Sequence, residues 1–240
     1  MTTPLFRDDA GLRETRATVR AITDRGGIVL DQTVFYPTSG GQPGDAGRLL
    51  WDNGACDIAT TVYEEDRVTI VHVPGQATTL PEPGASVTAI LDWERRHRLM
   101  RMHTCLHLMC SLIPFPVTGG QISVDESRLD FDIEDAGAIE KDDLTARLNA
   151  LISADHPIST RWITDEELDA NPSLVRTMSV KPPRGSGRVR LVAIGENGSV
   201  DLQPCGGTHV ASTREICAVA ITKIEKKGRL NRRIRVALAE

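Results

Sequence analysis

Two short motifs, far apart along the chain, carry the side chains best suited to chemistry. They are His103-Thr104-Cys105-Leu106-His107 and Cys205-Gly206-Gly207-Thr208-His209. Each motif offers two potential metal ligands with three residues between them, and three imidazoles with one thiolate form a set that suits Zn²⁺. On a helix, positions i and i+4 share one face, whereas the two glycines of the second motif favour a tight loop. The sequence therefore predicts a zinc site made by His103, His107, Cys205 and His209.

The chemistry of such a site depends on the residues between and around the ligands. Proteases of the His-Glu-x-x-His type use the glutamate as a general base, but here Thr104 and Cys105 take the intervening places. A zinc protease of that type is therefore not expected. Four protein ligands ordinarily close a tetrahedral zinc and make it structural, so a catalytic role requires an exchangeable or a fifth ligand. The sequence leaves these two roles open, and it predicts that Cys105 and Cys110 are core thiols.

A glycine-rich segment near the N-terminus contains Gly40-Gly41-Gln42. Glycine lets the backbone approach a ligand closely, and a glutamine amide can orient a water or bind an ester carbonyl. The same three residue types recur at Gly119-Gly120-Gln121. We interpret the repeat as a coincidence, but its place after the first histidine motif makes Gln121 a candidate for lining the pocket.

The formal net charge of −5 excludes a basic field over the whole molecule that would recruit nucleic acid. The charge is uneven, because basic residues outnumber the single acid Glu225 between positions 223 and 235. Such a segment is compatible with phosphate contact, and equally with a solvated surface. Its basic residues are Lys223, Lys226, Lys227, Arg229, Arg232, Arg233 and Arg235.

Cysteine usage and hydropathy indicate where the protein works. The five cysteines are an odd number without the spacing of a disulfide framework, which indicates a reducing compartment. The chain has no run of about 18 apolar residues, so we expect no membrane span. The first residues lack a basic segment followed by an apolar one, so we expect no secretion and a cytoplasmic location.

Short apolar runs separated by turn signals fill the first 91 residues and predict strands. Many short strands at near-regular spacing suggest a small, mostly antiparallel barrel or sandwich without helices. The predicted strands are Thr18–Ile22, Gly27–Leu30, Gly47–Trp51, Cys56–Tyr63, Arg67–Val73 and Ser86–Leu91.

The pattern changes at Asp92, which is suited to an N-cap, and Trp93–Ile113 then predicts a helix that ends before Pro114. After a glycine-rich turn at 118–121, strands and helices alternate. The predicted strands are Ile122–Ile133, Ile158–Ile163, Arg188–Ile194, Ser199–Leu202, Ile216–Ile224 and Arg232–Leu238, and the predicted helices are Gly137–Ser153 and Asp165–Ala170. We therefore expect an α+β protein: a small antiparallel β-barrel at 1–91, followed at 92–240 by an α+β domain with an antiparallel sheet and a metal-bearing helix.

Further motifs accompany the metal-ligand candidates. They are Val29–Tyr36 with Ser39-Gly40-Gly41-Gln42 and Asp45-Ala46-Gly47; Asp92, Arg96 and Met100 with His103-Thr104 and His107-Leu108; Ser127–Phe131; Cys205–Val210; Ile221 with Lys223; and Lys227-Gly228. Together they resemble the alanyl-tRNA editing proteins of the AlaX type over nearly the whole chain. These proteins are similar to the editing region of alanyl-tRNA synthetase and, in the second half, to that of threonyl-tRNA synthetase.

The resemblance implies hydrolysis of a wrongly attached amino acid from alanine-specific tRNA, chiefly serine, with glycine as a second candidate. It implies that zinc held by the four ligands anchors the pocket, and that the chain is of the medium-length form with an extra β domain. Two departures leave the rate and the amino-acid preference open: Cys105 replaces a small or polar residue, and Thr213–Cys217 replaces a run that often reads Thr-Gly-Glu-Ile-Gly. The expected tRNA-binding residues are Gly40, Gly41, Gln42, Lys223, Lys226, Lys227, Arg229 and Arg232.

An aminoacyl ester is already activated, so its hydrolysis needs a positioned water and a polarised carbonyl rather than a strong nucleophile. We expect zinc either to activate that water or to bind the amino or hydroxyl group of the amino acid. The predicted catalytic residues are Thr104, Gln121 and Thr208. One alternative is a zinc-stabilised tRNA-binding module without turnover. Another is the editing of serine on threonine-specific tRNA, against which the Gly-Gly-Gln domain argues.

Overall fold

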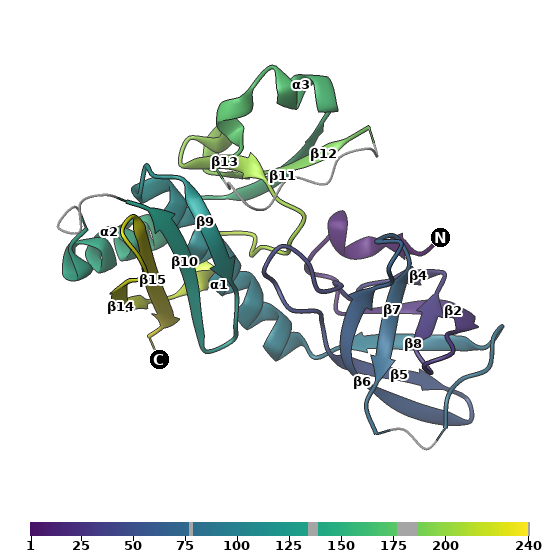
Figure 1. Cartoon of the computed structure of the whole chain (residues 1–240). Helices are drawn as coiled ribbons and strands as arrows, with labels where there is room; N and C mark the ends of the chain where they lie inside the picture. The colour runs from purple at the N-terminus through teal and green to yellow at the C-terminus, as the bar shows by residue number, and fades with distance from the viewer. Residues whose placement is uncertain (77–78, 134–138, 177–186, 240) are drawn as a thin grey trace. The chain divides into compact units, whose positions relative to one another are not determined.

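The structure is a computed structural model, and it describes residues 1–76, 79–133, 139–176 and 187–239. The chain divides into two compact units, Met1–Leu99 and Met100–Glu240, and the division falls inside helix α1 (Trp93–Leu112). Figure 1 shows strands in both units and few helices. The protein is therefore of the α+β class, as the sequence predicts. Among the described residues, no helix combines the length and the apolar character that crossing a membrane requires.

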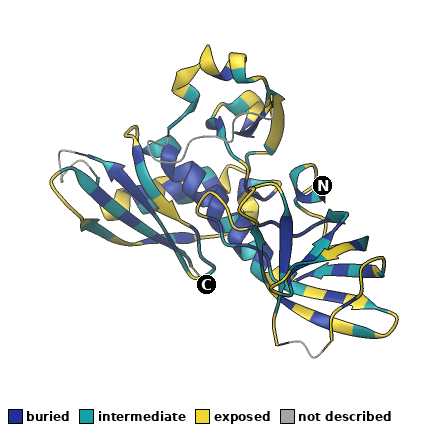
Figure 2. Ribbon diagram, turned by 45° about the vertical axis from the view of Figure 1, so that its right-hand side comes forward, coloured by how far each residue is buried: buried dark blue, intermediate teal, exposed yellow. Residues whose placement is uncertain are grey.

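The first unit is built on a closed barrel in which six strands follow one another in the order β2-β3-β7-β6-β5-β8. Buried and exposed residues alternate along several of these strands, as Figure 2 shows, because successive side chains of a strand point to opposite faces. The inward side chains form one apolar core. The strands are β2 (Glu14–Ile22), β3 (Ile28–Leu30), β5 (Gly47–Trp51), β6 (Gly54–Tyr63), β7 (Ile70–Pro74) and β8 (Ser86–Leu91).

Short elements that the sequence did not reveal precede and join the barrel strands. Strands β1 (Thr3–Pro4) and β4 (Gln32–Thr33) form a parallel pair, and the 3₁₀ helix η1 (Leu5–Arg7) lies between them in sequence. Elements of two or three residues leave no periodic pattern, which explains why they were missed.

A buried ion pair fixes the long loop between β4 and β5. The guanidinium of Arg96 and the carboxylate of Asp45 are 0% and 1% exposed, and Arg96 Nε lies 2.9 Å from both carboxylate oxygens. Arg96 also donates to the carbonyl of Val34 (2.7 Å), and Asp45 accepts from the backbone N–H of Tyr36 (2.6 Å). A buried charge pair is tolerated when further hydrogen bonds satisfy both partners, and these contacts do so.

Helix α1 begins and ends as its sequence predicts. The carboxylate of Asp92 accepts a hydrogen bond from the N–H of Arg95 (3.1 Å), which is an N-cap contact, and the helix stops at Leu112, two residues before Pro114. The apolar residues expected at helical spacing are buried: Leu99, Leu106, Met109 and Ile113.

The second unit contains two antiparallel sheets. The larger sheet has the order β14-β15-β10-β9, and the smaller has the order β11-β12-β13. Helix α2 is tied to the larger sheet by Asn149, whose side chain bonds the backbone N–H and C=O of Val219 (3.0 and 2.8 Å). The strands are β9 (Val117–Gln121), β10 (Glu126–Asp132), β11 (Ile158–Ile163), β12 (Val189–Ile194), β13 (Asp201–Pro204), β14 (Val219–Lys226) and β15 (Asn231–Leu238). The helices are α2 (Lys141–Ser153), α3 (Asp165–Asp169) and the 3₁₀ turns η2 (Pro172–Leu174), η3 (Glu196–Gly198) and η4 (Thr213–Ile216).

Several predicted bounds in this unit are wrong, among them the strand expected at Ile122–Ile133, which is β10 and begins at Glu126. The expected glycine turn at 118–121 is strand β9, in which Gly119 and Gly120 pair with Asp130 and Leu129. A Cβ on Gly120 would lie 2.8 Å from the Leu129 side chain, so this glycine permits a close strand contact rather than a turn. The strand expected to begin at Ile216 begins at Val219, because Ser212 and Glu215 form a capping box that starts η4. The predicted first residues of α2, 137–138, lie outside the described residues.

Candidate metal centre

Helix α1 brings the first two ligand candidates together. His103 and His107 are one helical turn apart, their ring centroids lie 5.3 Å from each other, and both side chains are buried. Each is less than one-tenth exposed, so neither imidazole is a solvated surface group. The helix therefore presents two adjacent imidazoles on one side, as the i, i+4 spacing predicts.

The second pair comes from the loop that follows β13. Cys205 leaves the strand with its backbone N–H bonded to the carbonyl of Arg190 (3.0 Å). The guanidinium of Arg190 donates in turn to the carbonyls of Cys205 and Gly207, both at 3.0 Å. These three bonds hold the loop so that His209, four residues on, returns beside Cys205.

The four candidates converge as one donor set. Their ligand atoms all lie within 4.8 Å of one another. Cys205 Sγ is 3.4 Å from Nε2 of both His103 and His209. In a tetrahedral zinc site with bonds of about 2.3 Å to sulfur and about 2.0 Å to nitrogen, sulfur and nitrogen lie about 3.5 Å apart. The donor set and its spacing therefore fit zinc.

Two of the imidazoles are oriented by hydrogen bonds from outside the set. His107 Nδ1 lies 2.9 Å from a carboxylate oxygen of Asp201, which accepts its proton, and Gln203 donates to the same oxygen (2.8 Å). His209 Nδ1 lies 3.1 Å from the hydroxyl of Thr104, which itself donates to the carbonyl of Met100 (2.9 Å). With both Nδ1 atoms protonated, the Nε2 atoms carry lone pairs, and a metal-binding histidine requires this arrangement.

The local charges match a site that receives a cation. Burial alone would raise the pKa of the Cys205 thiol, but the imidazoles of His103 and His209 lower it well below its ordinary value. Burial disfavours charge on His107 also, yet its hydrogen bond to Asp201 and the nearby Cys205 raise its pKa to about 10. Burial and the neighbouring His103 lower the pKa of His209. A thiolate thus needs a compensating positive charge, which a proton or a metal ion can supply.

The remaining predicted catalytic residues differ in their surroundings. Thr104 and Thr208 are fully buried, and the Thr104 hydroxyl is engaged with Met100 and His209. That geometry favours a role for Thr104 in positioning His209. Gln121 is exposed at the end of β9, opposite Arg128 of β10. The two other cysteines near the histidine pair are core thiols as predicted, since burial raises the pKa of Cys105 and of Cys110 to about 12.

The Gly40-Gly41-Gln42 segment forms a tight turn in the first unit. The backbones of Ser39 and Gln42 bond each other in both directions (3.1 and 2.9 Å). Gly40 and Gly41 have φ angles of 57° and 84°, a conformation that glycine adopts readily. These two glycines are exposed, whereas Gln42 is 0% exposed. The exposed part of the predicted tRNA contact is therefore the glycine pair.

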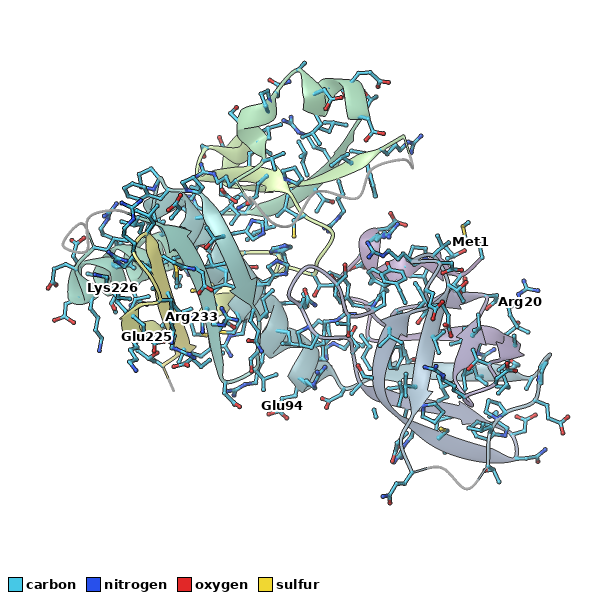
Figure 3. All side chains as sticks on the ribbon, in the orientation of Figure 1. Met1, Arg20, Glu94, Glu225, Lys226 and Arg233 are labelled. Atoms are coloured by element: carbon cyan, nitrogen blue, oxygen red, sulfur yellow. The ribbon has the colours of Figure 1, made fainter. Side chains whose placement is uncertain are left out.

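The basic segment of β14 and β15 is partly neutralised by its own acids. Arg235 bonds Glu225 (2.7 Å), holding the pKa of that carboxyl at about 2, and Lys223 and Lys227 each lie 3.3 Å from Glu225. Figure 3 labels Glu225, Lys226 and Arg233 on these strands. Arg232 is buried, whereas the other four predicted contacts of the segment are exposed: Lys223, Lys226, Lys227 and Arg229.

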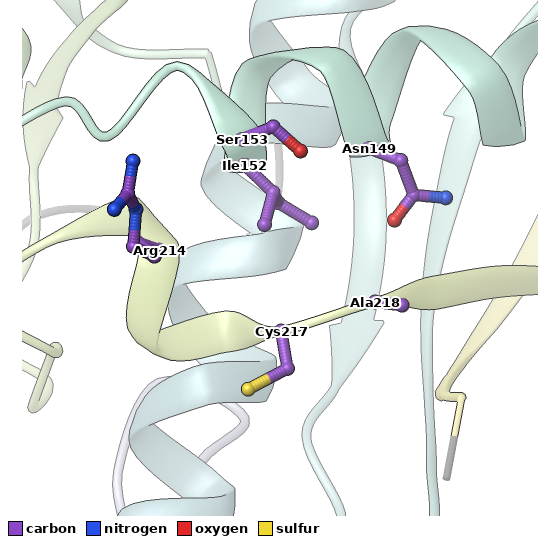
Figure 4. A pocket seen from close by; sticks show the side chains of 6 residues that line it. All are labelled: Asn149, Ile152, Ser153, Arg214, Cys217 and Ala218. Atoms are coloured by element: carbon purple, nitrogen blue, oxygen red, sulfur yellow. The ribbon is translucent and has the colours of Figure 1, made fainter.

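A separate pocket of about 490 Å³ lies beside α2 (Figure 4). The four metal-ligand candidates are not among its described lining residues. Cys217, whose thiol is exposed, has a φ angle of 60°, which is unusual for a residue with a side chain. The lining residues are Asn149, Ile152, Ser153, Arg214, Cys217 and Ala218.

Three residues that contact the candidate ligands or their loop were not predicted from the sequence: Asp201, Gln203 and Arg190. Asp201 and Gln203 of β13 alternate with Cys205, which directly follows the strand, so the three side chains are expected on one face, and that period-two spacing was a usable signal. Arg190 gave no such signal, because its contact with the loop depends on the pairing of β12 with β13.

Comparison with known proteins gives the class of these domains. A model of class II (A) tRNA synthetases matches residues 10–95, and a model of the threonyl and alanyl tRNA synthetase second additional domain matches residues 189–235. The chain thus combines two kinds of domain found in aminoacyl-tRNA synthetases.

Full-length relatives narrow this class to one family. The alanyl-tRNA editing protein AlaX-M of Methanosarcina acetivorans is 34% identical over the whole of both chains, and that of Saccharolobus solfataricus is 30% identical over 98% of each. The alanine–tRNA ligase of Pyrobaculum arsenaticum is 34% identical over 94% of this chain but only 25% of its own length. The chain belongs to the AlaX-M family of alanyl-tRNA editing proteins.

Proposed function

We propose that the protein is a trans-editing deacylase that hydrolyses the ester between a wrong amino acid and alanine-specific tRNA. Serine is the expected main amino acid and glycine the second. The observation that carries the proposal is the convergence of His103, His107, Cys205 and His209 within 4.8 Å, in a chain that matches AlaX-M proteins from end to end. A hydrolase of this kind requires tRNA as its partner and works in the cytoplasm.

Zinc bound by these four residues would supply a Lewis acid that either activates a water or holds the amino or hydroxyl group of the amino acid. The chain itself supplies orientation. Asp201 and Thr104 fix the ring orientation of His107 and His209, and Arg190 fixes the loop that carries Cys205. Because an aminoacyl ester is already activated, its hydrolysis needs a positioned water and ester more than a strong nucleophile, and these contacts supply such positioning.

Selection of serine over alanine requires polar groups that hydrogen-bond the serine hydroxyl. A site built to bond a hydroxyl rejects an analogue lacking it far more strongly than an apolar pocket rejects an added group. Thr208 and the exposed Gln121 remain the candidate polar groups for that task, and for holding the attacking water.

For tRNA contact we propose the exposed members of the predicted set. They combine close backbone approach at the glycine turn with positive charge on the second unit, which suits phosphate groups. They are Gly40, Gly41, Lys223, Lys226, Lys227 and Arg229.

A specific observation also supports a second candidate, a zinc-stabilised tRNA-binding module without turnover. Four protein ligands converge, and a fully protein-ligated zinc is ordinarily structural. For zinc to act catalytically, one of the four protein ligands must dissociate or a fifth ligand must bind.

The deciding experiment measures deacylation of four substrates by the zinc-loaded protein. They are alanine-specific tRNA charged with serine, glycine or alanine, and threonine-specific tRNA charged with serine. We expect fast loss of serine, slower loss of glycine and retention of alanine on the alanine-specific tRNA. Binding without any hydrolysis would leave the binding-module function, and preferential attack on the threonine-specific substrate would replace the tRNA assignment.

A further inference from the structure

In the three-stranded sheet, a row of neighbouring residues connects the loop of Cys205 and His209 with an exposed tryptophan, Trp162. In the register of β11 and β12, Trp162 stands directly opposite Arg190. On the other side of Arg190, the backbone N–H of Cys205 donates to its carbonyl (3.0 Å). Arg190 therefore lies between Trp162 on β11 and Cys205 at the end of β13. With strands about 4.8 Å apart, the two ends of the row are about 10 Å apart.

The indole of Trp162 stands on the metal side of this sheet. Asp201 and Gln203 of β13 both contact His107, which defines that side. Residues directly opposite in antiparallel strands share a face, and residues two apart on one strand share a face. Gln203 is opposite Val192, Val192 is two residues from Arg190, and Arg190 is opposite Trp162.

Trp162 is also open to a partner. Among the strands of the described residues, β11 lies at the edge of its sheet, and the tryptophan is 43% exposed. The proposed substrate carries its ester on the terminal nucleotide of a single-stranded tRNA end. Unstacked bases of such ends stack on large aromatic side chains, so a nucleobase is the ligand that suits Trp162.

We propose that Trp162 is a stacking platform for a base at the 3′ end of the aminoacylated tRNA, whose ester lies at the metal centre. This inference rests on the proposed function. Stacking on Trp162 holds the terminal nucleotide and so sets where its ester lies relative to Cys205. The contact acts mainly on binding, and it is indifferent to the amino acid attached.

The kinetic test compares Trp162→Ala and Trp162→Phe with the wild type on serine-charged, alanine-specific tRNA. Because base–aromatic stacking is lost, Trp162→Ala should raise KM about 5- to 100-fold with kcat within about twofold, and Trp162→Phe should restore most of the affinity. Phe115→Ala, which truncates another exposed aromatic side chain, is the matched control and should leave KM unchanged. Zinc content and the far-ultraviolet circular dichroism spectrum establish that each variant is folded. A wild-type KM in folded Trp162→Ala would overturn the inference.

A binding test separates this inference from the proposed function. Replacing Trp51 and Trp93 by phenylalanine leaves Trp162 as the single tryptophan of the chain. Its fluorescence should be quenched by the trinucleotide CCA and not by a trinucleotide whose 3′ residue lacks a base. If the wild type hydrolyses no aminoacyl-tRNA, the proposed function fails and the quenching alone decides about Trp162. If the wild type is active but the trinucleotide and its abasic analogue act alike, only the stacking inference fails.

Discussion

At the scale of single residues, side chains outside the four candidate ligands orient the imidazoles of the candidate metal centre. The carboxylate of Asp201 holds His107, and the hydroxyl of Thr104 holds His209. Such outer partners fix the tautomer and raise the basicity of the ligating nitrogen. We therefore expect metal affinity to depend on more residues than the four candidate ligands.

The substitution Asp201→Asn tests this dependence. It keeps the shape of the side chain but removes the charge that stabilises the protonated Nδ1 of His107. We expect zinc affinity to fall about 10- to 100-fold, measured by competition with a fluorescent chelator. Asp125→Asn, at an exposed position of the same unit, should bind zinc like the wild type. Equal affinities for the two variants would show that Asp201 has no part in metal binding.

The substitution Cys217→Gly should stabilise the protein. Cys217 has φ 60° and ψ −155°, a region that essentially only glycine adopts without strain. Removing its Cβ should raise the free energy of unfolding by about 1 kcal/mol in urea titrations. Cys217→Ala separates backbone strain from loss of the thiol, because it keeps the Cβ and should bring no gain. Equal stability of the glycine and alanine variants would argue against strain at this position.

At the scale of elements, patterns internal to a segment made the secondary structure predictable. The bounds of β5, β8 and β11 agree with the predicted strands, and α1 ends within one residue of its prediction. Asp92 and Pro114 mark the start and the end of α1 through local effects that do not depend on the rest of the fold. The four metal-ligand candidates could be found for the same reason, since each pair lies within five residues.

Features that depend on pairing between distant segments could not be predicted. Gly119 and Gly120 have the composition of a turn, and only their pairing with β10 makes them a strand. Asp201 contacts His107 across 94 positions of sequence; its alternation with Gln203 and Cys205 predicts a shared face but does not identify His107 as the partner. Trp162 is an ordinary strand residue until the order β11-β12-β13 brings it into line with Cys205.

Strand β7 gives the barrel a predicted sensitivity to acid. His72 is fully buried, with Nδ1 donating to the carbonyl of Ile28 (3.0 Å) and Nε2 accepting from the hydroxyl of Thr33 (2.8 Å). Burial lowers its pKa from 6.5 to about 4. Because the unfolded chain then takes up the proton first, stability is present above pH 6.5 and is lost as the pH falls towards 4.

The expected loss from this one group is about 3 kcal/mol between those two pH values. The substitution His72→Gln removes the titrating group, so its free energy of unfolding should depend less on pH over the same range, whatever its absolute stability. Urea titrations at several pH values measure both slopes. Identical slopes in the variant and the wild type would exclude His72 as a source of acid sensitivity.

At the scale of the whole molecule, the net charge of −5 does not attract tRNA, so we expect local basic side chains to make the phosphate contacts. Arg235 and Glu225 neutralise each other, and Arg233 is paired with Asp130 (2.8 Å). Lys226 and Arg229 are exposed in the same segment. Phosphate contact by this part of the protein should therefore depend on a few side chains rather than on the whole basic run.

The double variant Lys226→Ala/Arg229→Ala should bind tRNA more weakly. Each lost phosphate contact should reduce the slope of log K against log salt concentration by about one. Filter binding at several salt concentrations measures this slope. Lys141→Ala/Arg147→Ala removes the same charge from exposed positions of α2 and should leave the slope unchanged. The same decrease in both variants would indicate a general effect of charge rather than contact at the basic segment.

We expect the hydrolysis of mischarged tRNA by this protein to depend on the centre formed by His103, His107, Cys205 and His209. The most direct measurement titrates zinc into metal-free protein and follows the hydrolysis of serine-charged, alanine-specific tRNA, with alanine-charged tRNA in parallel. Serine release should rise with zinc and saturate at about one ion per chain, while alanine is retained. Undiminished serine release by the metal-free protein, or equal release of serine and alanine at saturation, would contradict zinc-dependent editing at this centre.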